Sequence, residues 1–185
     1  FGEWCAGQGM PLSYHHHMAA VIETEPELDL FVKHSGEGIP LLFDAGHMAF
    51  AGGNVLRVID NHHSRITHVH VKDERMDVIN KLDRAKQSFL DAVALGAFTV
   101  PGDGSLDFEA IVKKFAGYGY EGWFVVEAEQ DPVKSPPLKM AQIGHKELKF
   151  ITNFGFFFGF ALGIPVALVT NAIHLWWLLP LLGIF

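Results

Sequence analysis

Tyr14-His15-His16-His17-Met18 is the stretch from which we infer the fold, and it ends an apolar run that begins near Met10. The run is short and is led in by Gly and Pro residues, as expected for a buried strand. Three adjacent imidazoles at its end can supply metal ligands and proton donors at one place. We therefore look for other strands whose ends would meet them.

Strands and helices alternate along the first part of the chain. We expect strands over residues 10–17, 39–43, 66–71 and 123–127. We expect the tail of a helix over residues 1–6, helices after the N-caps Thr24 and Asn54, and helices over residues 84–95 and 107–115. Short apolar strands separated by helices are typical of parallel pairing and of an α/β fold.

Each expected strand ends in polar side chains. The clusters are His15 to His17, Asp44 with His47, His68 with His70, and Glu127 with Glu129. Ligands of α/β folds bind beyond the carboxyl ends of the strands, where these clusters would meet. One such side chain is more often a cap or a satisfied hydrogen-bond partner, but four clusters in the same topological position favour a site.

The clusters combine imidazoles with carboxylates, a ligand set that favours a divalent first-row metal such as Mn, Co, Zn or Fe. Such a metal would bind a carbonyl and a neighbouring hydroxyl and would polarise the ketone. The adjacent C–H would then be acidic enough for a carboxylate or His to remove.

The composition separates two unlike parts. The chain has 185 residues and a formal net charge of -7, and all its Lys, Arg, Asp and Glu residues lie before residue 150. We expect no nucleic-acid partner, because phosphate binding needs a basic face. Cys5 is the only cysteine, which fits a reducing cytoplasm for the charged part.

Five long motifs in one order carry a resemblance to a known family. They are YHHHM (14–18), LLFDAGHMAFAGG (41–53), HVHVKD (68–73), FTVPGDGSLDF (98–108) and GYEGWFVVEAEQDP (119–132). Together they resemble the inosose dehydratase family of the xylose isomerase-like TIM barrel superfamily. The resemblance implies dehydration of 2-keto-myo-inositol (scyllo-inosose) to a trihydroxycyclohexane-dione, with Mn or Co as the metal and glutathione as a further cofactor.

The resemblance also implies a set of metal ligands. In the superfamily four strand ends supply Glu, Asp, His and Glu, and Asp44, His70 and Glu127 match the last three of these positions. The first position departs from the pattern. We expect His15 there, with Glu23, His16 and His17 as alternatives.

The same resemblance implies roles in catalysis and substrate binding. His47 would bind a substrate hydroxyl. By spacing, Lys72 follows His70 by two and should face the same cavity, where it would stabilise an enolate or assist the leaving hydroxyl; a solvated lysine at the strand end is the alternative. Either Glu127 or Glu129 would be the base, and the sequence leaves this choice open. The expected substrate-binding residues are His16, His17, His47, His68 and Asp103, the last by resemblance alone.

Two features extend beyond this interpretation. A full TIM barrel has eight strands and about 250 residues, so residues 1–149 are expected to form a partial barrel from the last four strands, with weak metal binding and low turnover. Residues 150–185 form an uncharged hydrophobic segment, and Ile151 to Thr170 has about the 20 residues needed to cross a bilayer. We expect membrane association through this segment, with a buried core as the alternative.

Two rival functions remain open. A metal-dependent sugar isomerase or epimerase of the same superfamily would use the same ligands without eliminating water. A non-catalytic, membrane-anchored module would only bind its partner. For the enzymes the expected partner is a small cyclitol or sugar, and an oligomer is compatible with each reading.

Overall fold

The computed structural model describes residues 1–145 and 149. The chain divides into two compact units, Phe1–Glu147 and Leu148–Phe185. Within the described residues, every helix is too short or too polar to cross a bilayer. The hydrophobic segment predicted at residues 150–185, and its membrane association, lie outside the described residues.

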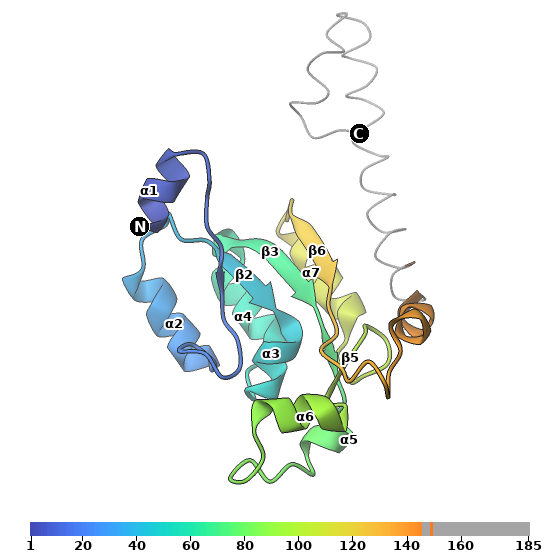
Figure 1. The fold of residues 1–185 in the computed structure, drawn as a ribbon. Coiled ribbons are helices and arrows are strands. Elements are labelled where there is room, and N and C mark those ends of the chain that lie inside the picture. Colours follow the sequence, from blue (N-terminus) through green and yellow to red (C-terminus); the bar gives the residue numbers. More distant parts are fainter. Residues whose placement is uncertain (146–148, 150–185) are drawn as a thin grey trace, which may run out of the picture. The chain divides into compact units, whose positions relative to one another are not determined.

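A parallel sheet forms the centre of the first unit, with the strand order β1-β2-β3-β6 (Figure 1). The strands are β1 (Tyr14–His15), β2 (Leu41–Asp44), β3 (Ile66–Val71) and β6 (Trp123–Val126). All three neighbouring pairs are parallel. This arrangement confirms the predicted α/β class and the parallel pairing of the four strands.

Helices connect the strands. They are α1 (Gly2–Gly7), α2 (Glu25–His34), α3 (Ala45–Phe50), α4 (Val55–His62), α5 (Met76–Ile79), α6 (Phe89–Leu95) and α7 (Phe108–Gly117), with a 3₁₀ turn η1 (His63–Arg65). Residues 137–145 are also helical. Local capping fixes several starts: the Asn54 side chain accepts the Arg57 N–H at 3.0 Å, and the Asp107 side chain accepts the Ala110 N–H at 2.9 Å.

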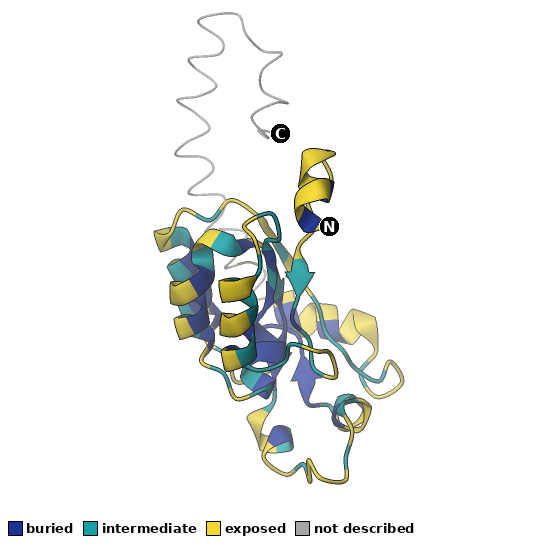
Figure 2. Ribbon diagram, turned by 90° about the vertical axis from the view of Figure 1, so that its left-hand side faces the viewer, coloured by how far each residue is buried: buried dark blue, intermediate teal, exposed yellow. Residues whose placement is uncertain are grey.

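The main core lies between one face of the sheet and α2, α4 and α7. Leu41 and Phe43 of β2 and Val69 and Val71 of β3 are fully buried in this core. The helices contribute their apolar stripes and leave polar faces in solvent (Figure 2). Side chains alternate along a strand, so Asp44 and its register partner His70 point to the opposite face.

A smaller layer lies beyond the carboxyl ends of β2 and β3 (Figure 1). Strands β4 (Asp73–Glu74) and β5 (Phe98–Thr99) pair antiparallel. With α5 and α6 they enclose a second apolar cluster of Phe50, Ile79, Ala92, Ala97 and Phe98. This layer was not predicted as a unit.

Two elements differ most from the predicted bounds. The first strand covers only Tyr14–His15 and not residues 10–17, and Pro11 has no N–H to give to a sheet. The helix expected from residue 84 begins at Phe89, because Ser88 is its N-cap and its side chain accepts the Asp91 N–H.

Candidate metal and substrate site

The sheet brings three of the predicted ligands to one point. His15 ends β1, Asp44 ends β2, and His70 lies opposite Asp44 on β3. The Asp44 Oδ2 atom lies 3.6 Å from His15 Nε2 and 3.4 Å from His70 Nδ1. One ligand atom from each residue lies within 4.8 Å of the other two.

Glu127 follows β6 directly and reaches the same point. Its Oε2 atom lies 2.9 Å from His70 Nδ1 and 3.0 Å from Lys72 Nζ. We call the four predicted ligands the first group: His15, Asp44, His70 and Glu127. Glu23, the alternative fourth ligand, instead accepts the Ala19 N–H at 2.6 Å.

The first group contains four buried polar atoms that lack a hydrogen-bond partner. They are His15 Nε2, Asp44 Oδ2, His70 Nδ1 and Glu127 Oε2. Ion-pair contacts among these residues and with Lys72 offset the cost of burying the four atoms, but none of the four has the geometry of a hydrogen bond. Two imidazole nitrogens and two carboxylate oxygens are a donor set that suits a first-row divalent ion. The residues present therefore fit a metal.

A second group of potential ligands lies beside the first. It consists of His17, His47 and Glu129. The Glu129 carboxylate lies 3.5 Å from the Nε2 atoms of both His17 and His47. His47 is positioned because the Asp44 side chain accepts its N–H at 3.0 Å at the start of α3.

Lys72 lies between the two groups and is fully buried. Its Nζ atom is 2.8 Å from His47 Nε2 and donates to Glu129 Oε2 at 3.0 Å. The same atom is 3.3 Å from Asp44 Oδ2. Gly46 permits this packing, because a Cβ there would lie 2.8 Å from the Lys72 carbonyl oxygen.

Burial and mutual charge set the protonation states. Burial alone would lower the pKa of Lys72, but Asp44, Glu129 and Glu127 raise it above its ordinary value. Burial lowers the pKa of His47 to about 3. His47 is therefore neutral at physiological pH, and its Nε2 can accept a hydrogen bond from the Lys72 ammonium.

In the first group, contacts between opposite charges outweigh burial, and the pKa shifts favour the charged forms. The carboxylates of Asp44 and Glu127 raise the pKa of His70 to about 9. Contact with His70 in turn lowers the pKa of Glu127 to about 2 against the effect of burial. Burial would raise the pKa of Asp44, yet His15, His70 and Lys72 hold it well below its usual range.

His16 has a position that the sequence did not predict. Its ring is fully buried, and Nε2 accepts the backbone N–H of Asp44 at 3.2 Å. Burial lowers its pKa to about 4, which keeps the ring neutral. A direct contact with substrate would require the ring to leave this hydrogen bond, so the structure gives His16 a place behind Asp44.

The other two predicted substrate-binding residues lie at the edge of the site or in a local network. The ring of His68 lies 5.6 Å from that of His70 on the same face of β3. Asp103 accepts the Thr99 hydroxyl at 2.7 Å and pairs with Arg75. Its carboxylate is thus held by the loop after β5.

Two aromatic residues that the sequence did not single out wall the second group. The Phe89 ring centroid is 5.5 Å from that of His17, and Phe98 is 5.5 Å from His47. Lys72 Nζ lies 5.6 Å from the Phe98 ring. In the sequence, the motif at residues 98–108 could have indicated a role for Phe98, whereas no motif includes Phe89.

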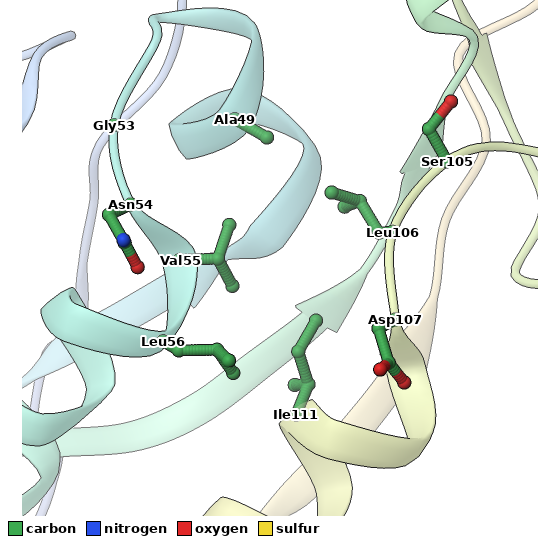
Figure 3. Close-up of a pocket in the computed structure, with 9 residues that line it drawn as sticks. All are labelled: Ala49, Gly53, Asn54, Val55, Leu56, Ser105, Leu106, Asp107 and Ile111. Carbon is green, nitrogen blue, oxygen red and sulfur yellow. The ribbon is translucent and has the colours of Figure 1, made fainter.

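A separate pocket of about 260 Å³ lies between α4 and the start of α7. Val55, Leu56, Leu106 and Ile111 project into it from its two sides (Figure 3). None of its lining residues belongs to either group of ligands. It is a hollow between packed helices.

Comparison with known proteins gives consistent results. Residues 2–151 match the family described as Xylose isomerase-like TIM barrel. The chain is 49% identical over 140 residues to the rhizopine catabolism protein MocC of Rhizobium meliloti, covering 76% of this chain and 43% of that protein. It is 47% identical over 141 residues to an inosose dehydratase of Geobacillus thermodenitrificans, covering 76% and 47%.

A solved structure shows the same fold at low identity. The crystal structure of the IOLI protein with a binding zinc atom aligns with a TM-score of 0.58 and 14% identity, covering 80% of this chain and 51% of that one. The chain thus spans about half the length of the proteins it matches.

Proposed function

The chain belongs to the xylose isomerase-like TIM barrel family, and from this premise we propose that it acts in the dehydration of 2-keto-myo-inositol to a trihydroxycyclohexane-dione. Relatives named inosose dehydratase, 42–47% identical, support this proposal. The observation that carries it is the convergence of four unsatisfied ligand atoms from four strand ends beside a buried lysine.

The first group would hold a divalent metal, for which we propose Mn or Co. Such an ion would polarise the substrate ketone and increase the acidity of the neighbouring C–H. The zinc named in the IOLI structure supports a divalent ion in this fold, though not a particular element. Binding would require His70 to give up the proton that Asp44 and Glu127 favour.

Glu129 is our proposed base. Glu127 belongs to the first group, whereas Glu129 lies two residues further on, beside His17 and His47 and outside the proposed metal ligands. Glu129 would take the proton from the carbon next to the ketone and then return it to the departing hydroxyl, which leaves as water. The enol that remains is converted to the dione by proton transfer.

Lys72 and His47 would stabilise the charge that develops in this step. The raised pKa of Lys72, set by Asp44, Glu129 and Glu127 against burial, favours an ammonium that keeps its proton. It is therefore suited to stabilise an enolate, and less to donate a proton to the leaving hydroxyl. Neutral His47 and the nearby His17 would bind substrate hydroxyls.

The decisive test is product analysis with the purified chain and Mn²⁺. We expect a product that absorbs in the ultraviolet and has lost one water from 2-keto-myo-inositol. The Glu129→Gln variant is the matched control, because it keeps the size and removes the base. A product of unchanged mass would instead favour the isomerase or epimerase. A chain that binds neither metal nor substrate would contradict the proposal.

Two further parts of the proposal rest on the resemblance. Addition of reduced glutathione to the same assay should increase turnover if glutathione is a cofactor. A cytoplasmic site of action, with membrane association through residues 150–185, is tested by carbonate extraction of membranes. Release of the whole chain into the soluble fraction would contradict the anchor.

A further inference from the structure

The two groups of ligands have the same spacing. Two ligands of one tetrahedral ion with bonds of about 2.1 Å lie about 3.4 Å apart. In the first group Asp44 Oδ2 lies 3.4 Å and 3.6 Å from its two imidazole neighbours. In the second group the two oxygens of Glu129 divide the contacts: Oε1 lies 3.5 Å from His17 Nε2, and Oε2 lies 3.5 Å from His47 Nε2. Both groups therefore have dimensions that suit a divalent ion.

The groups differ in how their ligand atoms are satisfied. The Lys72 ammonium approaches Asp44 Oδ2 and Glu127 Oε2 of the first group without hydrogen-bond geometry, and the two imidazole nitrogens of that group also have no hydrogen-bond partner. In the second group, His47 Nε2 and Glu129 Oε2 both contact the Lys72 ammonium, at 2.8 Å and 3.0 Å. An ion bound between these two atoms would lie about 2 Å from each, and the ammonium nitrogen already occupies the space in front of them.

The ammonium is held as a bound cation would be. Its nitrogen also lies 3.0 Å from Glu127 Oε2 and 3.3 Å from Asp44 Oδ2, and the whole side chain is shielded from solvent. Three N–H donors thus face four acceptor atoms, one nitrogen and three oxygens. Removal of the ammonium would leave the carboxylates of Asp44, Glu127 and Glu129 side by side without the cation that neutralises them.

We propose that Lys72 is a built-in cation that fills the second group, so that the chain binds one divalent ion, in the first group, and excludes another from the second. The proposal deepens the proposed function and rests on it for the metal of the first group. A fixed ammonium gives the site a permanent positive charge that does not exchange with solvent.

The test is the number of Mn²⁺ ions bound per chain, measured by equilibrium dialysis against rising Mn²⁺ with elemental analysis. We expect one ion for the unmodified chain and two for Lys72→Ala. Lys72→Arg retains the charge and should bind one. Lys72→Ala combined with His17→Ala and His47→Ala should return to one, which locates the extra ion.

Controls separate folding from binding. Circular dichroism identifies variants that do not fold, and Lys72→Met, which keeps most of the packing without the charge, replaces Lys72→Ala if the latter unfolds. An unchanged number of ions in the folded neutral variants, or two ions in the unmodified chain, would overturn the proposal.

The same data distinguish failure of the proposed function. If the unmodified chain binds no ion while Lys72→Ala gains one that requires His17 and His47, the role of Lys72 is supported. The proposed metal of the first group would then be wrong.

Discussion

The two faces of β2 and β3 differ in almost every physical property. One face packs Phe43 and Val69 against helices without exposure to solvent. The other carries Asp44 and His70, whose facing atoms are buried and unsatisfied. The first face stabilises the fold by apolar packing, whereas the second brings together the charged side chains of the candidate site. Strand alternation lets a single short segment do both, because neighbouring residues point to opposite faces.

The largest expected effect on metal binding is from Asp44→Asn, on the polar face. The amide oxygen can still cap α3 through the His47 N–H, but the charge at the centre of the first group is lost. Removal of outer partners of a metal typically costs 10–100-fold in affinity, so we expect a loss of more than about 100-fold for this ligand. Calorimetric titration with Mn²⁺ measures it, and a loss of affinity below about tenfold, or about 1.4 kcal/mol, would contradict the role.

Glu129→Gln should lower turnover while metal affinity stays close to normal. Loss of a positioned base typically costs about 10²–10⁴-fold in rate. The comparison is with Glu127→Gln, which should weaken metal binding as well because Glu127 belongs to the first group. If the two variants show the same pattern in kcat and in Mn²⁺ titration, the assignment of the base to Glu129 is wrong.

Phe43→Ala tests the apolar face. Phe43 is fully buried, and truncation of a buried Phe lowers the free energy of unfolding by about 3–5 kcal/mol. Urea unfolding measures this loss, with Phe43→Leu as a control expected to lose less than about 1.5 kcal/mol. Metal affinity of the folded fraction should change little, and a large change in affinity would show that the two faces are not independent.

Glu74 should make the stability of the fold depend on pH. Burial, followed by the charge of Asp73, raises its pKa to about 8 from 4.5. Because the folded state holds the Glu74 proton more tightly than the unfolded state does, folding is favoured while Glu74 is protonated. This contribution to stability is complete below pH 4.5 and is lost as the pH rises through about 8. Unfolding experiments across this window should show falling stability, and Glu74→Gln should flatten the slope. An equal slope in the variant would contradict this account.

Local sequence signals predicted the parts of the fold that depend on neighbouring residues. The strand at residues 66–71 has the predicted bounds, because its apolar run and its alternating histidines lie within one short window. Asn54 caps α4 as expected. Topology predicted that the strand-end clusters meet, since parallel strands end at the same edge, and the family resemblance selected His15, Asp44 and His70 among them.

Other parts depend on contacts that no local pattern contains. Strands β4 and β5 have two residues each, which is too short for periodicity to show. The partners of Lys72 come from three different segments and depend on how its side chain turns. The placement of His16 behind Asp44 was also missed, because three adjacent histidines look alike in a sequence although alternation sends them to different faces.

The hydrogen bond from the Asp44 backbone to His16 determines the tautomer of the His16 ring as well as its position. An Nε2 atom that accepts an N–H cannot carry a proton, so the neutral ring must hold its proton on Nδ1. With a pKa lowered to about 4 by burial, this tautomer should persist across the working pH range. His16 is therefore an internal spectroscopic reporter: its ring ¹⁵N resonances should stay constant while those of His70 respond to Mn²⁺ or to pH.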